Sequence, residues 1–207
     1  MTQKTELEAE IDRAAAALRG AKHLVVFTGA GISTESGLPD FRGPDGVWTR
    51  RDKGLPPPRG KRIAEVQPNG AHAALVRLQE ADRLGFLISQ NVDDLHLKSG
   101  IRPALLAELH GNALRLRCVA CEATCPKVAA PAPCACGGTQ FRSSVINFGD
   151  DLPRRDLAQA YAHSRRADGF LVVGSTLRVT PASDMPQIAL EAGAPLVIVN
   201  LGETPYD

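Results

Sequence analysis

The stretch from 23 to 48, HLVVFTGAGISTESGLPDFRGPDGVW, constrains the fold most, because it joins an apolar run to a glycine turn. The run at 24–27 is short and rich in β-branched residues, which predicts a buried parallel strand. Gly29-Ala30-Gly31 predicts a tight turn, with Ser33 or Thr34 as the N-cap of a following helix. Backbone N–H groups at such a turn bind anions, and glycines let a pyrophosphate approach. The stretch predicts a phosphate site, although an apolar strand before a glycine turn is also common as plain structure.

The continuation at 37–43, GLPDFRG, strengthens the interpretation as a site. It places Asp40, Phe41 and Arg42 between turn-forming residues, directly after the expected phosphate turn. Loops that carry such side chains beside an anion cradle are usually binding sites, since an arginine recognises phosphate oxygens.

Composition sets the class of protein. With 207 residues, 43% hydrophobic and 23% charged, the chain can form one large globular domain, or one with a small lobe. A net charge of +1 gives no overall attraction to nucleic acid or to acidic membranes. Two basic clusters, at 50–53 and 59–62, are more typical of a solvated loop than of a surface for an acidic partner. No export signal or membrane-length apolar run is present, so we expect an intracellular, cytoplasmic protein, nuclear if the source is a eukaryote.

Expected strands and helices alternate along the chain, which indicates an α/β fold with a doubly wound parallel sheet of Rossmann-like type. The Pro-rich segment 49–67 is expected to be a mobile loop that folds over a bound ligand. Helices are expected at 5–18, 71–81, 155–165 and 186–191, and strands at 24–27, 84–89, 104–109, 141–148, 167–173 and 195–200.

Polar residues follow several of these strands. The clusters are 29–33, Gln90 to Asp93, Gly174 to Thr176, and Asn200. The carboxyl ends of parallel strands meet at one edge of a sheet, so these clusters predict a site for an extended nucleotide. Asn91 or Asp93 could equally cap a helix.

His110 lies between glycine and an apolar stretch, where a histidine could titrate. A lone histidine is more often an ordinary surface or core residue than a catalyst.

All five cysteines fall between Cys118 and Cys136. In a chain without an export signal, such clustering favours metal over disulfides. Two pairs of thiolates about a dozen residues apart are typical of a zinc ribbon, and four thiolates leave no open position for catalysis. The second pair is C-x-C, so Cys125 is an alternative to Cys134. We expect three segments: 1–112 and 145–207, which build the nucleotide domain, and 113–144, a small inserted zinc lobe.

The combination resembles the sirtuins, a family of NAD-dependent protein deacylases. The matching segments are GAGISTESGLPDFRG, QNVDDLH, ELHGN, the cysteine insert, VVGSTLRVTPASDMP and VIVNLGETPYD. The run 41–48, FRGPDGVW, is most similar to the branch that contains the chromatin-associated nuclear sirtuins. That branch includes deacetylases, long-chain deacylases and mono-ADP-ribosyltransferases.

The resemblance implies a role for each matching residue. His110 would be the general base, with Asn91 acting in catalysis as well as in binding. Structural zinc would be bound by Cys118, Cys121, Cys134 and Cys136. The NAD-binding set would be Gly29, Ala30, Gly31, Thr34, Asp40, Phe41, Arg42, Trp48, Gln90, Asn91, Asp93, Gly174, Ser175, Thr176 and Asn200.

The implied activity is transfer of an acyl group, acetyl or longer, from protein lysine to NAD, which releases nicotinamide and O-acyl-ADP-ribose. An acyl-lysine peptide would add as a strand between 146–150 and 177–181. The alternatives are protein mono-ADP-ribosylation, NAD hydrolysis, and a non-catalytic NAD-sensing module.

The chain departs from the family pattern at several positions. Asp94 stands where glycine or asparagine is usual, Asp150 replaces glutamate, and Ser175-Thr176 inverts the common order. No Tyr-x-x-Arg follows Trp48, which disfavours a desuccinylase. Relatives continue beyond Asp207, so we expect a trimmed chain or a more open adenine pocket.

Overall fold

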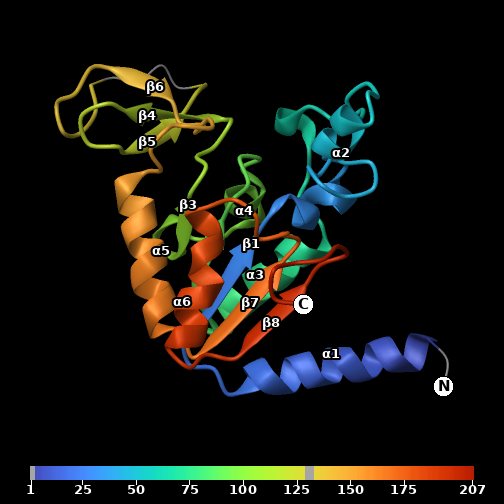
Figure 1. Ribbon diagram of the computed structural model, residues 1–207. Helices are drawn as coiled ribbons and strands as arrows, with labels where there is room; N and C mark the ends of the chain where they lie inside the picture. The colour runs from blue at the N-terminus through green and yellow to red at the C-terminus, as the bar shows by residue number, and fades with distance from the viewer. Residues whose placement is uncertain (1–2, 129–132) are drawn as a thin grey trace.

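A five-stranded parallel sheet with strand order β3-β2-β1-β7-β8 forms the centre of the protein in the computed structural model, which describes residues 3–128 and 133–207 (Figure 1). The order confirms the expected doubly wound sheet, because the chain starts at β1 in the middle and extends to both edges. The strands are β1 (Leu24–Thr28), β2 (Leu84–Ser89), β3 (Leu106–Glu108), β7 (Gly169–Val173) and β8 (Leu196–Val199).

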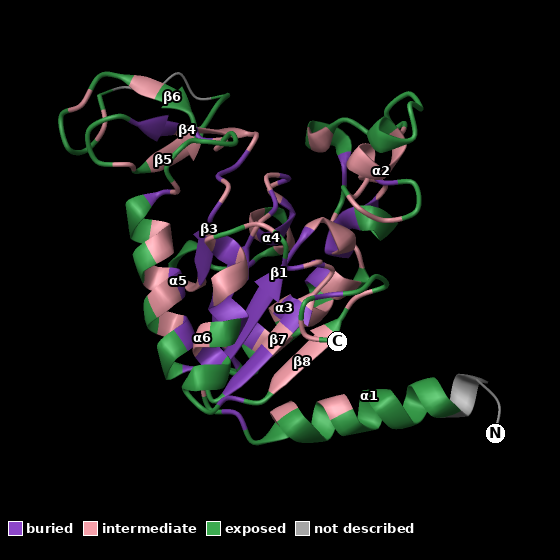
Figure 2. Cartoon of the chain, viewed as in Figure 1, coloured by how far each residue is buried: buried purple, intermediate pink, exposed green. Residues whose placement is uncertain are grey.

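Two hydrophobic cores cover the two faces of this sheet. Val25 and Phe27 of β1 belong to the core that faces α5 and α6, whereas Leu24 and Val26 belong to the core that contains Leu75 of α3. Successive strand residues point to opposite faces, so a strand buried on both faces must be apolar throughout. Figure 2 shows β1 buried along its whole length, as the apolar run in the sequence predicts.

Four helices agree closely with those expected. They are α1 (Gln3–Arg19), α3 (Gly70–Glu80), α5 (Arg154–Arg166) and α6 (Met185–Glu191). The short helix α4 (Leu95–Ser99) begins after Asp93, where the sequence allowed a capped helix as an alternative. The side chain of Asn69 accepts hydrogen bonds from the backbone N–H groups of Ala71 and His72 and so caps α3. Helix α1 extends beyond the lower end of the sheet, with Leu7 and Ile11 exposed (Figure 1). Within the described residues, no helix is both long and apolar enough to cross a membrane.

A second, three-stranded antiparallel sheet, ordered β5-β4-β6, stands apart from the main sheet (Figure 1). Its strands are β4 (Arg115–Cys118), β5 (Thr124–Pro126) and β6 (Phe141–Ser143). The expectation that 141–148 returns to the main body as a strand was wrong. Phe141 pairs instead with Cys118 in the small sheet, and the strand ends at Ser143.

One local expectation near the glycine turn is also corrected, and the structure adds detail to the segment 49–67. Residues Ala30–Ser36 form a 3₁₀ helix, η1, and its N-cap is Gly29, without a side-chain cap from Ser33 or Thr34. The segment 49–67 is not an unstructured loop throughout. It contains most of α2 (Val47–Asp52) and a short 3₁₀ turn, η2 (Ile63–Glu65).

Candidate active site

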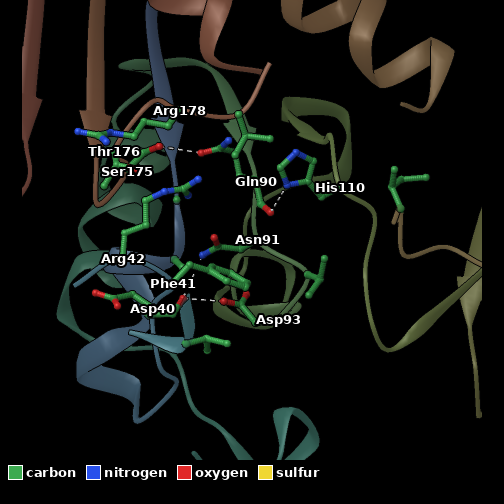
Figure 3. Close-up of a pocket in the computed structure, with 18 of the residues that line it drawn as sticks. Asp40, Phe41, Arg42, Gln90, Asn91, Asp93, His110, Ser175, Thr176 and Arg178 are labelled. Carbon is green, nitrogen blue, oxygen red and sulfur yellow. Dashed lines mark hydrogen bonds between the residues drawn. The ribbon is translucent and has the colours of Figure 1, made fainter. Parts of the chain in front are cut away.

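A cavity of about 950 Å³ lies at the carboxyl ends of the parallel strands. Its lining includes Gly29 after β1, Gln90 after β2, Gly174 after β7 and Asn200 after β8. His110 follows β3 and lines the same cavity (Figure 3). Each of the five strands of the main sheet therefore contributes a residue to one space, as the sequence predicted from the polar clusters.

Two glycine turns form one side of the cavity. The backbone N–H of Gly29 donates to the carbonyl of Val173 at 3.1 Å, and that of Gly31 donates to the carbonyl of Gly174 at 2.9 Å. A Cβ at residue 29 would lie 2.7 Å from the Gly174 oxygen, closer than real Cβ contacts allow. The turns touch because neither carries a side chain.

A relay of hydrogen bonds orders the loop after β2. The amide nitrogen of Asn91 donates to Ser33 Oγ at 3.1 Å, and Ser33 Oγ donates to Asp93 Oδ2 at 2.6 Å. The other oxygen of Asp93 accepts the backbone N–H of Leu95 at 3.0 Å. Since Nδ2 of Asn91 is engaged in the relay, its amide oxygen is left as the group that can meet a ligand. Asn91 and Asp93 are thus held by protein contacts before any ligand binds.

Gln90 connects the β2 and β7 loops. Its side-chain oxygen accepts a hydrogen bond from Ser175 Oγ at 2.7 Å (Figure 3). Its backbone oxygen lies 2.9 Å from Nδ1 of His110.

The contact with Gln90 defines the protonation of His110. A carbonyl oxygen only accepts, so Nδ1 carries the hydrogen and Nε2 holds the free electron pair. Burial lowers the pKa of His110 from 6.5, while the hydrogen bond to Gln90 raises it. The imidazole is therefore neutral near pH 7, with Nε2 able to accept a proton.

An aromatic wall made of Phe41, Trp48 and Phe148 closes another side of the cavity. The Phe41 and Trp48 ring centroids are 5.3 Å apart, and those of Trp48 and Phe148 are 5.6 Å apart. The guanidinium of Arg42 lies 4.2 Å from the Trp48 ring centre. Asp40 Oδ1 accepts the backbone N–H of Gly43 at 2.9 Å, so this carboxylate shapes the loop.

Two arginines, Arg42 and Arg178, face the same part of the cavity. Burial, followed by the nearby guanidinium of Arg178, lowers the pKa of Arg42. Two cations that face one space repel each other and favour an anion between them.

Three comparisons with known proteins agree with this architecture. The sequence model described as "Sir2 family" matches residues 29–60 and 57–181. The NAD-dependent protein deacetylase SRT1 of Oryza sativa subsp. indica is 42% identical over 97% of this chain. The NAD-dependent protein deacetylase Sirt6 of Drosophila melanogaster is 36% identical over 92% of it. A solved structure described as "Sir2-p53 peptide-NAD+" has a TM-score of 0.72, with 34% identity, and covers 100% of this chain and 90% of that one.

The chain belongs to the Sir2 family. It spans only 44% of the length of the rice relative and 66% of that of the fly relative.

In this Sir2-family chain the cysteine lobe is built around four convergent thiols. The sulfur atoms of Cys118, Cys121, Cys134 and Cys136 all lie within 4.8 Å of one another. Cys118 and Cys136 are separated by 3.8 Å, and Cys121 and Cys134 by 3.5 Å. Tetrahedral zinc with Zn–S bonds of about 2.3 Å requires sulfurs about 3.8 Å apart, so the donor set fits structural zinc. Cys125 is not part of this cluster, which favours Cys134 as the fourth ligand.

The cavity brings together nearly all the residues that the sequence singled out. His110 and the expected NAD-binding residues line it, with the exception of Thr34. Thr34 is exposed, and its hydroxyl donates to the carbonyl of Gly31 at 2.9 Å. It stabilises the turn from outside the cavity.

Two contributions to the Sir2 cavity escaped the sequence analysis. Ser33 was treated as a helix cap, but it links Asn91 to Asp93. Arg178 was not singled out, although the expected peptide segment 177–181 contains it. Its position one residue after the strand-end cluster Ser175-Thr176-Leu177 was the only signal.

Proposed function

We propose that this chain is an NAD-dependent protein lysine deacylase, a transferase that releases nicotinamide and O-acyl-ADP-ribose. The observation that carries the proposal is the position of a neutral His110 in the same cavity as Asn91, Asp93 and the glycine turns. A base, an ordered carboxylate and a phosphate-binding turn are what this reaction requires in one place.

The residues present fit NAD. The volume, about 950 Å³, is at the upper end of the range typical of ligand sites, which suits a dinucleotide together with a second substrate. The glycine turns leave backbone accessible to a pyrophosphate, and Arg42 and Arg178 supply positive charge beside them. Gly174, Ser175, Thr176 and Asn200 would then hold the adenosine half.

The nicotinamide end would lie against the Asn91–Ser33–Asp93 relay. In this proposal Asp93 holds the carboxamide group, because its carboxylate is fixed and can accept one more N–H. Gln90 and Asn91 contact the adjoining ribose. Asp40 keeps Phe41 and Arg42 in position through the bend at Gly43.

Bound NAD supplies the electrophilic ribose carbon that takes up the acyl oxygen as nicotinamide leaves. His110 accepts at Nε2 the proton of a ribose hydroxyl, while Gln90 fixes the ring through Nδ1. Phe41 and Trp48 would keep water from the cationic ribose until the acyl oxygen has bonded to it; one water then hydrolyses the adduct, which frees the lysine amine and leaves the acyl group on a ribose oxygen.

The acyl-lysine partner is proposed to enter as an extended strand between 146–150 and 177–181. Val145 to Asp150 and Arg178 to Pro181 both line the cavity, which supports this entry. Backbone pairing of that kind tolerates varied sequences. Five free thiols and no paired cysteine in the described residues are in keeping with an intracellular location. We also propose that the segment 113–144 is a separate zinc lobe inserted between 1–112 and 145–207.

The proposal is tested by incubating the purified chain with NAD and an acetyl-lysine peptide, then measuring products by mass spectrometry. We expect equal amounts of nicotinamide, free-lysine peptide and O-acetyl-ADP-ribose. A series of peptides with longer acyl chains, run in parallel, defines the preferred acyl group.

Labelled NAD without peptide is the control. Label fixed to protein, or free ADP-ribose formed as fast as with peptide, would contradict deacylation and favour ADP-ribosyl transfer or NAD hydrolysis. NAD binding without any nicotinamide release would favour a sensing module.

A further inference from the structure

One side chain, Asn112, joins two acidic residues beside the cavity. Its amide nitrogen donates to Asp94 Oδ1 at 2.6 Å and to Glu108 Oε1 at 2.8 Å. Asn112 is 0% exposed. Its amide oxygen accepts the backbone N–H of Leu114 at 2.9 Å, and this contact orients the amide so that its nitrogen faces the acids.

The three residues connect the two loops that carry the proposed chemistry. Asp94 directly follows Asp93, while Glu108 and Asn112 flank His110 at two residues on either side. The backbone N–H of Ala113 also donates to the carbonyl of Val92 at 2.7 Å. A change in the Asn112 contacts would therefore move Asp93 relative to His110.

The backbone at Asp94 indicates that this residue is held for its side chain. Its φ is +66°, in the left-handed region where glycine is favoured, and it caps no helix N–H through its side chain. Holding a non-glycine residue there costs about 1 kcal/mol. Asn112 is the side chain that the Asp94 carboxylate contacts.

The charges around Glu108 are unbalanced. Burial first, and then the charges of Asp94 and Asp156, raise the pKa of Glu108, whereas Asn112 and Arg115 lower it, for a value of about 7. Arg115 donates to Thr124, and Arg117 lies 3.8 Å from Asp156. In residues 3–128 and 133–207, neither Asp94 nor Glu108 forms an ion pair. His110 is the other titratable group in the same loop.

We propose that Asp94 and Glu108 are positioning residues that act through Asn112 to hold the loop of Asp93 against the loop of His110, and that ionisation of Glu108 beside Asp94 weakens this link. Glu108 in its neutral form accepts from Asn112 without repelling Asp94. When it ionises, Glu108 becomes a stronger acceptor for Asn112 but also a second negative charge around one amide; the repulsion from Asp94 then separates the two carboxylates, and Glu108 turns toward Arg115 or solvent. Turnover then falls as the pH rises and Glu108 ionises. This fall is separate from the loss of turnover at low pH, where His110 is protonated.

This inference rests on the proposed deacylase function, and the test uses the pH profile of kcat/KM for NAD with an acyl-lysine peptide that has no group titrating near neutrality. For the wild type we expect a fall of about threefold or more between about pH 7 and about pH 8.5, since one ionisation gives at most tenfold per unit. Glu108→Gln keeps the acceptor oxygen and cannot ionise, and Asp94→Asn keeps an acceptor without the charge. Both variants should remain flat over that interval.

The variant Asp94→Gly removes the link itself. We expect kcat to fall about tenfold while the dissociation constant for ADP-ribose stays within about twofold, because Asp94 does not line the cavity. Asp82→Gly is the matched control, since Asp82 also has a positive φ, +53°, but is exposed and precedes the amino end of β2, opposite to the end that meets the cavity. If relief of the positive φ were the only consequence of the substitution, Asp94→Gly and Asp82→Gly would both keep the kcat of the wild type.

The outcomes separate the two proposals. A wild type that never releases nicotinamide contradicts the deacylase function; the link is then judged by NMR titration of Glu108, which should titrate near pH 7 in the wild type and lower in Asp94→Asn. An active wild type whose alkaline limb is absent, or persists in either charge-removing variant, overturns the inference and leaves the deacylase function intact. An Asp94→Gly variant with wild-type kcat would also overturn the inference and leave the deacylase function intact.

Discussion

The main sheet and the cysteine lobe differ in what stabilises them. The sheet buries side chains on both faces, and Val25, Phe27 and Phe170 are all fully inaccessible to solvent. In the lobe, Val119 is 54% exposed and Val128 is 98% exposed, while Cys118 is 1% exposed. The sheet is stabilised by apolar burial, whereas the lobe exposes these apolar side chains and, of its four converging cysteines, buries only Cys118, so we expect a bound metal to supply most of its stability.

The difference matters for the cavity, because the segment that directly follows the lobe lines it. The glycine turns, Gln90 and Asp93 come from the sheet, while the segment after the lobe supplies Val145 to Asp150. Ser144 ties the two together, since its hydroxyl accepts the backbone N–H of Asn112 at 2.8 Å and donates to the Asn112 carbonyl at 2.8 Å. Unfolding of either region should disrupt the site, and measurements of zinc content, proteolysis and thermal unfolding should tell the two cases apart.

Metal removal should produce the largest effect. Structural zinc contributes about 10 kcal/mol or more to folding of such lobes, so a chelator, or Cys121→Ser, should unfold 113–144. Limited proteolysis should then cut between Val119 and Gly138, deacylation should stop, and the far-ultraviolet circular dichroism of the main sheet should persist.

Cys125→Ser is the control, because Cys125 lies outside the cluster. It should bind one zinc per chain and resist the protease as the wild type does. A chelated chain with an intact, protease-resistant lobe would contradict the metal-dependent stability of this region.

A substitution in the core of the main sheet should lower the stability of the main domain and leave zinc binding by the lobe unchanged. Phe27→Ala removes a side chain that is 0% exposed and packs in the core between the sheet and helices α5 and α6, and should cost about 3–5 kcal/mol. Thermal unfolding should shift down by roughly 2–4 °C per kcal/mol, with zinc content unchanged. Val128→Ala, in the exposed part of the lobe, should stay within about 0.5 kcal/mol. Equal costs for the two variants would refute the contrast between the regions.

The glycine turn should show a smaller effect, directed at the ligand. In Gly29→Ala the new Cβ meets the Gly174 oxygen at 2.7 Å and the Ser175 Cβ at 2.8 Å, so the two turns must separate. We expect about a tenfold or greater loss of affinity for ADP-ribose, or about 1.4 kcal/mol, measured by calorimetry. Gly20→Ala has no atom within 4 Å of the new Cβ and serves as the control. Wild-type affinity in Gly29→Ala would mean that the turns do not shape the nucleotide site.

How far the sequence predicted this arrangement depends on the kind of feature. The buried strands at 24–27 and 84–89 were predicted correctly because a strand covered on both faces must be apolar throughout. The end of β6 was missed, since the apolar pattern at 141–148 does not reveal which sheet the strand joins.

Prediction of the site residues also depended on whether the signal was local in the sequence. Local patterns pointed to Asp93 and the cysteines, because these follow a strand end or repeat at a ligand spacing, whereas His110 was assigned as a base only by the resemblance to the sirtuins. The Asn91–Ser33–Asp93 relay and the Asn112 link join residues far apart in the chain, and only the folded structure brings these together. Ser33 in particular was assigned to local capping because a serine after a glycine turn carries that signal more strongly.

The acid side of the pH profile should show the smallest effect. The neutral imidazole is the active base, so turnover is present above the pKa of His110 and is lost as pH falls through it. Burial lowers that pKa from 6.5, so kcat/KM, which reports the groups of the free enzyme, should decline with a midpoint below 6.5. A midpoint at or above 6.5 would contradict a partly buried, neutral base.

The most direct test of the account is nicotinamide release by the wild type and by His110→Ala, with and without an acyl-lysine peptide. The account predicts that the wild type releases one nicotinamide per lysine freed, that His110→Ala loses about 10²–10⁴-fold in peptide turnover, and that its affinity for ADP-ribose is retained. His23→Gln, at the opposite end of β1, should behave as the wild type. Peptide turnover in His110→Ala equal to that of the wild type would contradict the central claim that this imidazole is the base of the cavity.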